Sequence, residues 1–255
     1  MNEKQWISFC NYKESLKLIV DEFEKSPLKN ELKFLQEKLI IDNNEKYQLE
    51  NSLVYNTSYD DFTKESNIKI IVIGDNPGWE EQLEKNKKFL VGQSGRLAEG
   101  FFRRNTVYNI DFRKNVIISN KTLVHTSKTK FLKTIEKNAS LELKNYLNEM
   151  QKQMAKLIAQ FHIDLIKYSS EKYVPELWLV GYSELKEKGI FSIYKEELKK
   201  SYINTDYWKN VYVYQHFSMN RFSIDLNEFK KSSSDDLLKC TKLLGLKHRI
   251  EIFGE

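Results

Sequence analysis

The chain has 255 residues, and its 41 Lys and Arg against 36 Asp and Glu give a formal net charge of +5. This length suits one α/β domain with a modest extension, and the small positive charge permits nucleic-acid binding without demonstrating it. We expect no membrane span and no secretion signal, because long apolar runs are missing, and the two cysteines are too few for a disulfide scaffold or a four-cysteine cluster.

The first 60 residues are predicted to be helical. Apolar side chains recur at helical spacing in two runs, and Pro27, between the runs, suits the first turn of the second helix. The runs are Trp6, Phe9, Leu16, Ile19, Val20 and Phe23, then Leu28, Leu32, Leu35 and Leu39. We interpret residues 1–60 as an N-terminal helical extension and residues 61–255 as the main α/β domain.

Short apolar segments rich in β-branched residues follow, over 68–73, 116–119, 177–180 and 211–214. Near-continuous apolar runs are typical of strands buried on both faces of a parallel sheet. Helical patterns separate them, around Leu97 and Phe101, from Leu147 to Phe161 and over 183–200, and a closing helix is expected at 235–244. The alternation predicts an α/β fold, a three-layer sandwich with a central four-stranded parallel sheet and flanking helices.

Polar turns follow the predicted strands. They are Gly74-Asp75-Asn76-Pro77-Gly78 after the first, Asn120 after the second, Gly181-Tyr182-Ser183 after the third, and His216 with Ser218 after the fourth. Because the carboxyl ends of parallel strands lie at one edge of a sheet, these side chains are expected to form a common site. A second glycine-rich turn, Val91-Gly92-Gln93-Ser94-Gly95-Arg96, opens the helix after the first strand.

The two glycine-rich turns and the His216-Phe217-Ser218 segment together resemble the uracil-DNA glycosylase superfamily, over residues 66–245. The motifs are most similar to its iron–sulfur type, but the four cysteines of that type are missing. The resemblance implies a monofunctional enzyme that rotates a nucleotide out of DNA and hydrolyses the bond between base and deoxyribose. We therefore expect a cytoplasmic monomer that binds DNA containing a damaged or modified base, with no metal, cofactor or membrane partner.

In this family, a side chain of the turn after the first strand positions the attacking water, and branches differ in the residue they use. Asp75 matches the acidic position of the iron–sulfur type, which usually carries glutamate, and Asn76 matches the Gly-x-Asn-Pro-Gly form of other types. A carboxylate could polarise water and stabilise positive charge on the sugar, whereas an amide could only orient the water. Both residues are therefore catalytic candidates.

Base recognition is assigned to three positions by the same resemblance. Phe89 corresponds to the aromatic residue on which the flipped base stacks, and Asn120 to the amide that reads the edge of the base. Gly74 would let the backbone approach the base closely. The sequence after Asn120 departs from the family pattern of lysine, cysteine, arginine and proline, which leaves the identity of the base open.

His216 is the candidate for stabilising the departing base anion by a hydrogen bond. Ser218 would hold a phosphate, and Met219 or Arg221 would fill the space that the flipped base vacates. Phe217 replaces the proline of the family pattern, which is expected to loosen this loop.

The second glycine-rich turn is expected to contact DNA. Ser94 is predicted to cap the following helix, whose backbone amides would bind a phosphate, with Gly92 and Gly95 allowing close approach and Arg96 adding a cation.

Other functions remain open at this point. One is a glycosylase for an unusual modified base of phage DNA, acting in defence. Another is a catalytically silent DNA-binding module of the same fold. A third is an unrelated nucleotide-binding α/β protein, although the sequence has neither GxxxxGK[ST] nor a complete GxGxxG.

Overall fold

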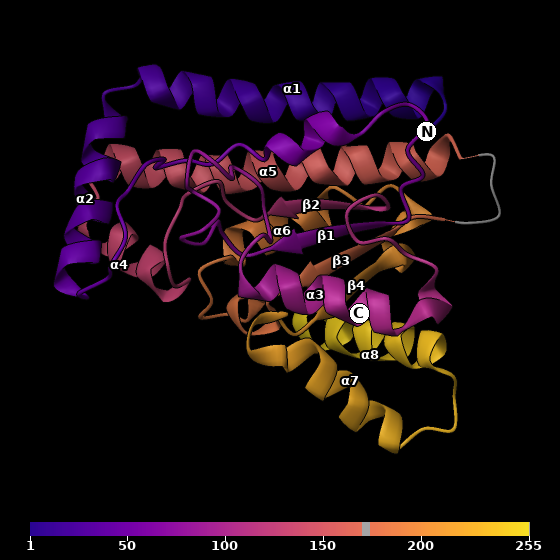
Figure 1. Cartoon of the computed structure of the whole chain (residues 1–255). Helices are drawn as coiled ribbons and strands as arrows, with labels where there is room; N and C mark the ends of the chain where they lie inside the picture. Colours follow the sequence, from indigo (N-terminus) through magenta and orange to yellow (C-terminus); the bar gives the residue numbers. More distant parts are fainter. Residues whose placement is uncertain (170–173, 255) are drawn as a thin grey trace.

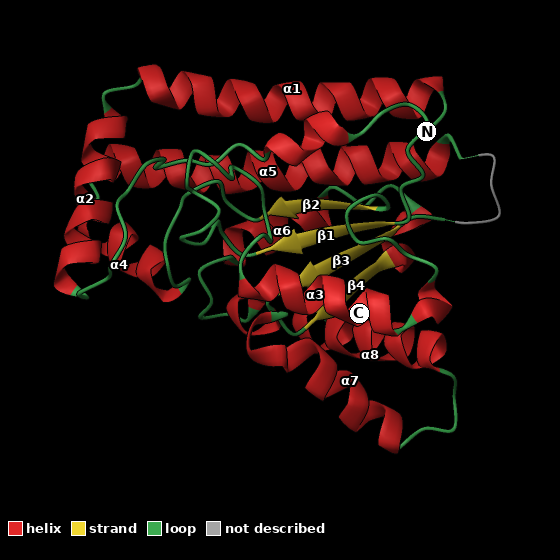
Figure 2. Ribbon diagram, viewed as in Figure 1, coloured by secondary structure: helices red, strands yellow, loops and turns green. Residues whose placement is uncertain are grey.

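The computed structural model describes residues 1–169 and 174–254, so residues 170–173 and 255 of the predicted main domain lie outside it. Within the described residues, a central parallel sheet has four strands in the order β2-β1-β3-β4. The strands are β1 (Ile70–Gly74), β2 (Val116–Asn120), β3 (Glu176–Val180) and β4 (Val211–Tyr214). All their arrows point the same way in Figure 2, and the register places Gly74 beside Asn120. The predicted α/β fold with a four-stranded parallel sheet is confirmed.

Helices cover both faces of the sheet (Figure 1). On one face, Trp178 of β3 stacks with Phe222 of α7 (Arg221–Lys231) and contacts Phe102 of α3 (Gln93–Arg104), and α8 (Leu237–Phe253) packs along β4. The opposite face is covered by α5 (Leu141–Lys167) and α6 (Ser192–Lys200), which pack against each other. Buried strands between two helical layers explain the near-continuous apolar runs in the sequence.

The N-terminal helices are α1 (Glu3–Lys25) and α2 (Leu28–Asp42). Figure 1 shows α1 lying along α5, and Tyr12 of α1 stacks on Phe161 of α5 with ring centroids 5.2 Å apart. The Tyr12 hydroxyl also donates to Oγ of Ser119 in β2, at 2.8 Å. α2 packs against α4 (Lys130–Asn138). The two helices predicted in the first 60 residues are present, whereas residues 45–56 form no helix, and the apolar side chains of both helices belong to the same core as the sheet.

Several predicted helix boundaries differ from the structure. The segment predicted as a helix from residue 183 first forms a short 3₁₀ turn, Tyr182–Leu185, and α6 begins only at Ser192. The last helix, α8, extends to Phe253, well beyond the predicted end at residue 244. Among the described residues, no helix combines the length and the apolar character needed to cross a bilayer.

Candidate functional site

A cleft of about 380 Å³ lies at the carboxyl ends of the strands. Most of the residues predicted from the sequence line it, as expected for side chains that follow parallel strands. The predicted residues that line it are Asp75, Asn76, Ser94, Asn120, His216, Ser218, Met219 and Arg221. Gly78, Gly181 and Ser183 of the predicted polar turns line it as well. Residues that were not predicted also line it: Glu81, Leu90, Thr126, Ser127, Lys128, Thr129, Glu184 and Gln215. One cleft therefore contains side chains from all four strand ends.

Asn76 presents an oxygen to the cleft because its nitrogen is held from behind. The side-chain Nδ2 donates to the backbone oxygens of Pro77 and Thr126 and to Thr126 Oγ1, each at 3.0 Å. These contacts fix the orientation of the amide and direct Oδ1 away from them. An amide oxygen fixed in this way can accept a hydrogen bond from water.

Asp75, in contrast, is largely occupied. Its Oδ1 lies 2.6 Å from Nζ of Lys121, a residue that the sequence analysis did not select. Lys121 is completely buried, and its Nζ also donates to the backbone oxygens of Val180, at 2.6 Å, and Gly74, at 3.1 Å. Burial lowers the pKa of Lys121, and the Asp75 carboxylate opposes this shift. The turn therefore contains one engaged carboxylate and one open amide oxygen.

Asn120 lies at the end of β2 with only 2 % of its surface exposed. Its Nδ2 is buried, and no described residue accepts a hydrogen bond from it. Gly74 lies against the other end of the amide, because a Cβ at Gly74 would stand 2.3 Å from Asn120 Oδ1. Gly74 is thus required for packing beside Asn120 and does not itself line the cleft. A buried donor without a partner costs about 1–3 kcal/mol, and an acceptor on a ligand would remove that cost.

His216 is half-buried and has a defined tautomer. The peptide N–H of Ser218 donates to His216 Nδ1 at 3.0 Å, and Ser218 Oγ lies 2.8 Å from the same nitrogen. Because Nδ1 accepts, the neutral ring carries its proton on Nε2. Burial lowers the pKa of His216, the Asp75 carboxylate raises it and the Lys121 ammonium lowers it. Ser218, predicted to hold a phosphate, therefore also orients the histidine.

Phe89 does not reach the cleft, contrary to its predicted stacking role. It is 1 % exposed and belongs to the core, while the next residue, Leu90, lines the cleft. Leu90 has a left-handed backbone, with φ of 50°, which redirects the side chains on either side of it. Its N–H donates to Glu81 Oε1 at 2.9 Å, and its carbonyl accepts from Arg113 at 2.7 Å. An apolar aliphatic wall stands where a ring was predicted.

Glu81 connects the two glycine-rich turns. Besides the contact with Leu90, its Oε2 accepts from the N–H of Gly78 at 3.1 Å. The carboxyl group is buried, and this burial raises its pKa from 4.5 to about 7. Glu81 lies only three residues after Gly78 in the sequence. A glutamate in a turn is expected to be exposed, so the sequence does not predict that Glu81 is buried.

The turn at residues 91–96 is arranged differently from the prediction. Gly92, rather than Ser94, is the N-cap of α3, and it makes no side-chain capping bond. Ser94 instead lies in the first turn of α3 and lines the cleft. Gly95 packs on the Leu90 carbonyl, so that a Cβ there would lie 1.5 Å from its oxygen. Arg96 lies outside the cleft lining, largely exposed, with one guanidinium nitrogen 3.6 Å from a Glu80 carboxylate oxygen.

Met219 and Arg221 lie at the rim of the cleft. Met219 has a left-handed backbone, with φ of 54°, and 72 % of its surface is exposed. Asn220 is also left-handed, and together they form the tight turn between His216 and α7. The turn therefore projects an apolar side chain into solvent beside the cleft.

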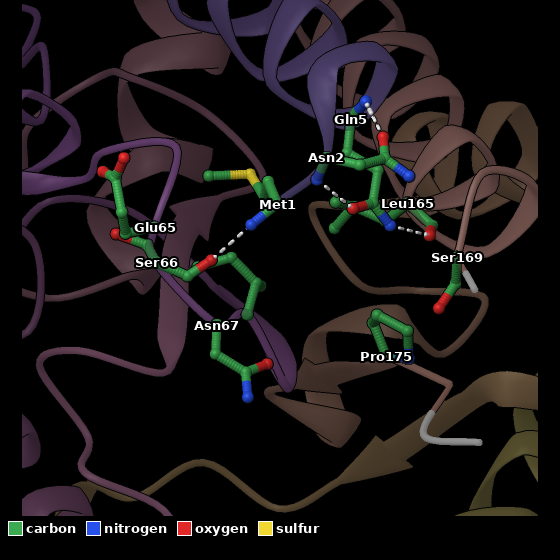
Figure 3. Close-up of a pocket in the computed structure, with 10 residues that line it drawn as sticks. Met1, Asn2, Gln5, Glu65, Ser66, Asn67, Leu165, Ser169 and Pro175 are labelled. Carbon is green, nitrogen blue, oxygen red and sulfur yellow. Dashed lines mark hydrogen bonds between the residues drawn. The ribbon is translucent and has the colours of Figure 1, made fainter. Parts of the chain in front are cut away.

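A second cavity, of about 490 Å³, lies at the other end of the sheet (Figure 3). Ile68 and Pro175, which precede β1 and β3, line it, so it faces the amino ends of the strands. Several polar groups drawn in Figure 3 pair with one another, as Gln5 does with Asn2 and with the Leu165 carbonyl. The predicted catalytic side chains line the cleft at the carboxyl ends of the strands and not this second cavity.

No group of three or more His, Cys, Asp or Glu side chains in residues 1–169 and 174–254 is arranged to hold a metal ion. The comparisons with known proteins add no relative. No protein-family model matches this chain, and comparison with curated proteins and with solved structures finds no match to either.

Proposed function

We propose that this chain is a DNA glycosylase that hydrolyses the N-glycosidic bond of a flipped-out uracil or another modified pyrimidine in DNA. We expect it to act as a cytoplasmic monomer without a cofactor. The observation that carries the proposal is the buried amide of Asn120, whose Nδ2 has no acceptor among the described residues. A pyrimidine carbonyl would supply that acceptor in a cleft already lined by Asn76 and His216.

Hydrolysis moves positive charge onto the sugar and negative charge onto the base that leaves. The open Oδ1 of Asn76 supports a role in orienting the water that attacks the sugar carbon. The engagement of Asp75 by Lys121 makes the carboxylate the weaker candidate for this role. An amide orients water without taking its proton, which is sufficient where the bond to the base breaks early.

His216 suits the stabilisation of the departing base. Its Nε2–H is a donor that needs no prior protonation, and a hydrogen bond to a base oxygen strengthens as negative charge develops there. The exposed Met219 on the neighbouring rim supports the insertion of an apolar side chain into the base stack. Leu90 takes the place of a stacking ring on the wall of the cleft.

The test is incubation of the purified protein with oligonucleotides that carry uracil, other modified pyrimidines or modified cytosines. Alkali then cleaves the DNA wherever a base has been removed. We expect breaks at one or more of these bases, and their loss in Asn76→Ala protein prepared in the same way. DNA binding without any break would instead identify a silent DNA-binding module, and no binding at low ionic strength would favour a nucleotide-binding protein.

A further inference from the structure

Lys121 is a cation fixed beneath the cleft. Its ammonium has three N–H groups and three acceptors, namely Asp75 Oδ1 at 2.6 Å, the Val180 carbonyl at 2.6 Å and the Gly74 carbonyl at 3.1 Å. Every donor therefore has a partner, which a charged ammonium achieves and a neutral amine does not. Burial of a cation in this way is tolerable only next to an acidic group, and the Asp75 side chain is the acidic group that contacts it.

The ion pair is closed off on the side of β3. Gly181 has φ of 94°, and a Cβ built there would lie 2.2 Å from Asp75 Oδ1 and 2.9 Å from Oδ2. The backbone of Gly181 thus covers the carboxylate while Lys121 binds it from below. Lys121 follows β2, Asp75 follows β1 and Gly181 follows β3, so the pair connects three strand ends.

Burial is the main cause that lowers the pKa of His216, which lines the same cleft as Asp75, and the two charges of the ion pair act on it in opposite directions. The Asp75 carboxylate favours protonation of His216, whereas the Lys121 ammonium disfavours it. A second proton on the ring would occupy Nδ1 and face the N–H of Ser218, which now donates to that nitrogen. The remaining charged residues that line the cleft are Glu81, Lys128, Glu184 and Arg221.

We propose that Lys121 is a positioning residue, which neutralises Asp75 and thereby keeps the His216 ring uncharged, with its proton on Nε2. This inference rests on the proposed function for its consequence, since the contact with the Ser218 N–H that orients the Nε2–H donor exists only while Nδ1 carries no proton. Without the ammonium, the carboxylate beneath the cleft would draw a proton onto Nδ1 and break the contact with Ser218.

The experiment is an NMR titration of the His216 ring, with the resonance identified by its absence in His216→Gln protein. We expect the pKa of His216 to lie below the usual 6.5, to rise in Lys121→Met and to fall in Asp75→Asn. The double variant Lys121→Met with Asp75→Asn should return close to the wild type. A purely structural role would not produce opposite shifts, so shifts in the same direction, or none, would overturn the proposal.

The matched control is Lys242→Met, which removes a lysine from an ion pair with Glu176, 2.8 Å away at the amino end of β3. It should leave the titration of His216 unchanged. If Lys121→Met does not fold, the titration of Asp75→Asn is the test. The Lys121 ammonium remains in that variant, so the proposal requires a lower pKa of His216 than in the wild type.

Single-turnover excision provides the second measurement. Protonation of Nδ1 breaks the contact with Ser218 that orients the ring, so the rate of Lys121→Met should fall more steeply than that of the wild type between pH 8 and pH 6. An unchanged pH profile despite a shifted titration would also overturn the proposal. The titration does not depend on catalysis, so absence of excision from every oligonucleotide would refute the proposed function and leave the titration to decide the role of Lys121.

Discussion

Asn120 has a buried amide whose nitrogen donates to no described residue. We expect this amide to lower the stability of the fold and to be needed for binding the base. Asn120→Leu replaces the amide by an apolar group of similar size. The free energy of unfolding should stay the same or rise, by up to about 1–3 kcal/mol, because a desolvated donor is removed. Excision should be lost, because the base has lost its partner. Urea denaturation and single-turnover excision on the same protein provide the measurements.

A suitable comparison for that variant is Gln151→Met. Gln151 in α5 also has a buried oxygen that accepts from no described residue, but it lies outside the cleft lining. The variant Gln151→Met should have a higher free energy of unfolding than the wild type and the same excision activity. A loss of stability in Asn120→Leu as large as its loss of activity would show that the amide serves the fold.

Asn76 allows a second prediction at the residue scale. Asn76→Ala removes the oxygen that faces the cleft and should lower single-turnover excision on the order of 10²-fold, with DNA affinity nearly unchanged. Asn138→Ala, at the exposed end of α4, is the control. Full activity in Asn76→Ala would move the water-orienting role to another residue, with Asp75 as the next candidate.

At the scale of elements, the two glycine-rich turns share the carboxyl group of Glu81, whose pKa burial raises from 4.5 to about 7. The folded state holds this proton more tightly than the unfolded state does. The contribution of Glu81 to stability is therefore intact below pH 4.5 and declines as pH rises to about 7, by about 3 kcal/mol in total. His125 and His162, whose pKa burial lowers to about 4, act in the opposite direction between pH 4 and 6.5.

The comparison with Glu81→Gln isolates this effect from the histidines. The variant should gain stability relative to the wild type as pH rises from 4.5 to above 7, measured by urea denaturation at several pH values. Glu37→Gln, on the exposed surface of α2, is the control for loss of a carboxyl group that is not buried. A constant difference between Glu81→Gln and the wild type would mean that burial does not raise the pKa of Glu81.

The turn that carries Met219 leads to a prediction on strand preference. Met219→Gly suits the left-handed backbone and removes an exposed side chain, so the fold should be unaffected or slightly more stable. If Met219 fills the space of a flipped base, excision from double-stranded DNA should fall several-fold while excision from single strands stays the same. Equal effects on both substrates would contradict the role.

The sequence predicts the strands and the edge at which the site forms, because apolar runs and the turns that end them are encoded locally. It does not predict that Lys121 is buried, since a lysine after a strand usually reaches solvent and its partners lie on two other strands. The sequence also predicts Phe89 in the cleft where the structure has Leu90. The left-handed backbone of Leu90 changes the directions of the side chains, and the sequence pattern does not reveal this. The orientation of Asn76 depends on Thr126, 50 residues away.

At the scale of the whole molecule, binding to DNA should weaken as salt concentration rises, because contacts with phosphate release counterions. Arg221 on the rim of the cleft is the candidate for one such contact. Arg221→Ala should reduce the slope of log affinity against log salt by about 1. Lys239→Ala, in a cavity that Ile70 and Glu176 also line at the amino end of the sheet, should leave the slope unchanged. An affinity independent of salt would argue against phosphate contacts altogether.

The backbone of Gly181 against the Asp75 carboxylate also bears on how such a site can evolve. A side chain at position 181 would displace the carboxylate, and loss of the carboxylate would strand the ammonium of Lys121. Each single change is therefore expected to be harmful in the presence of the other two residues, and tolerated only when they change as well. In a library that varies the three positions together, the surviving sequences should be correlated, so that an altered residue 75 appears with an uncharged residue 121.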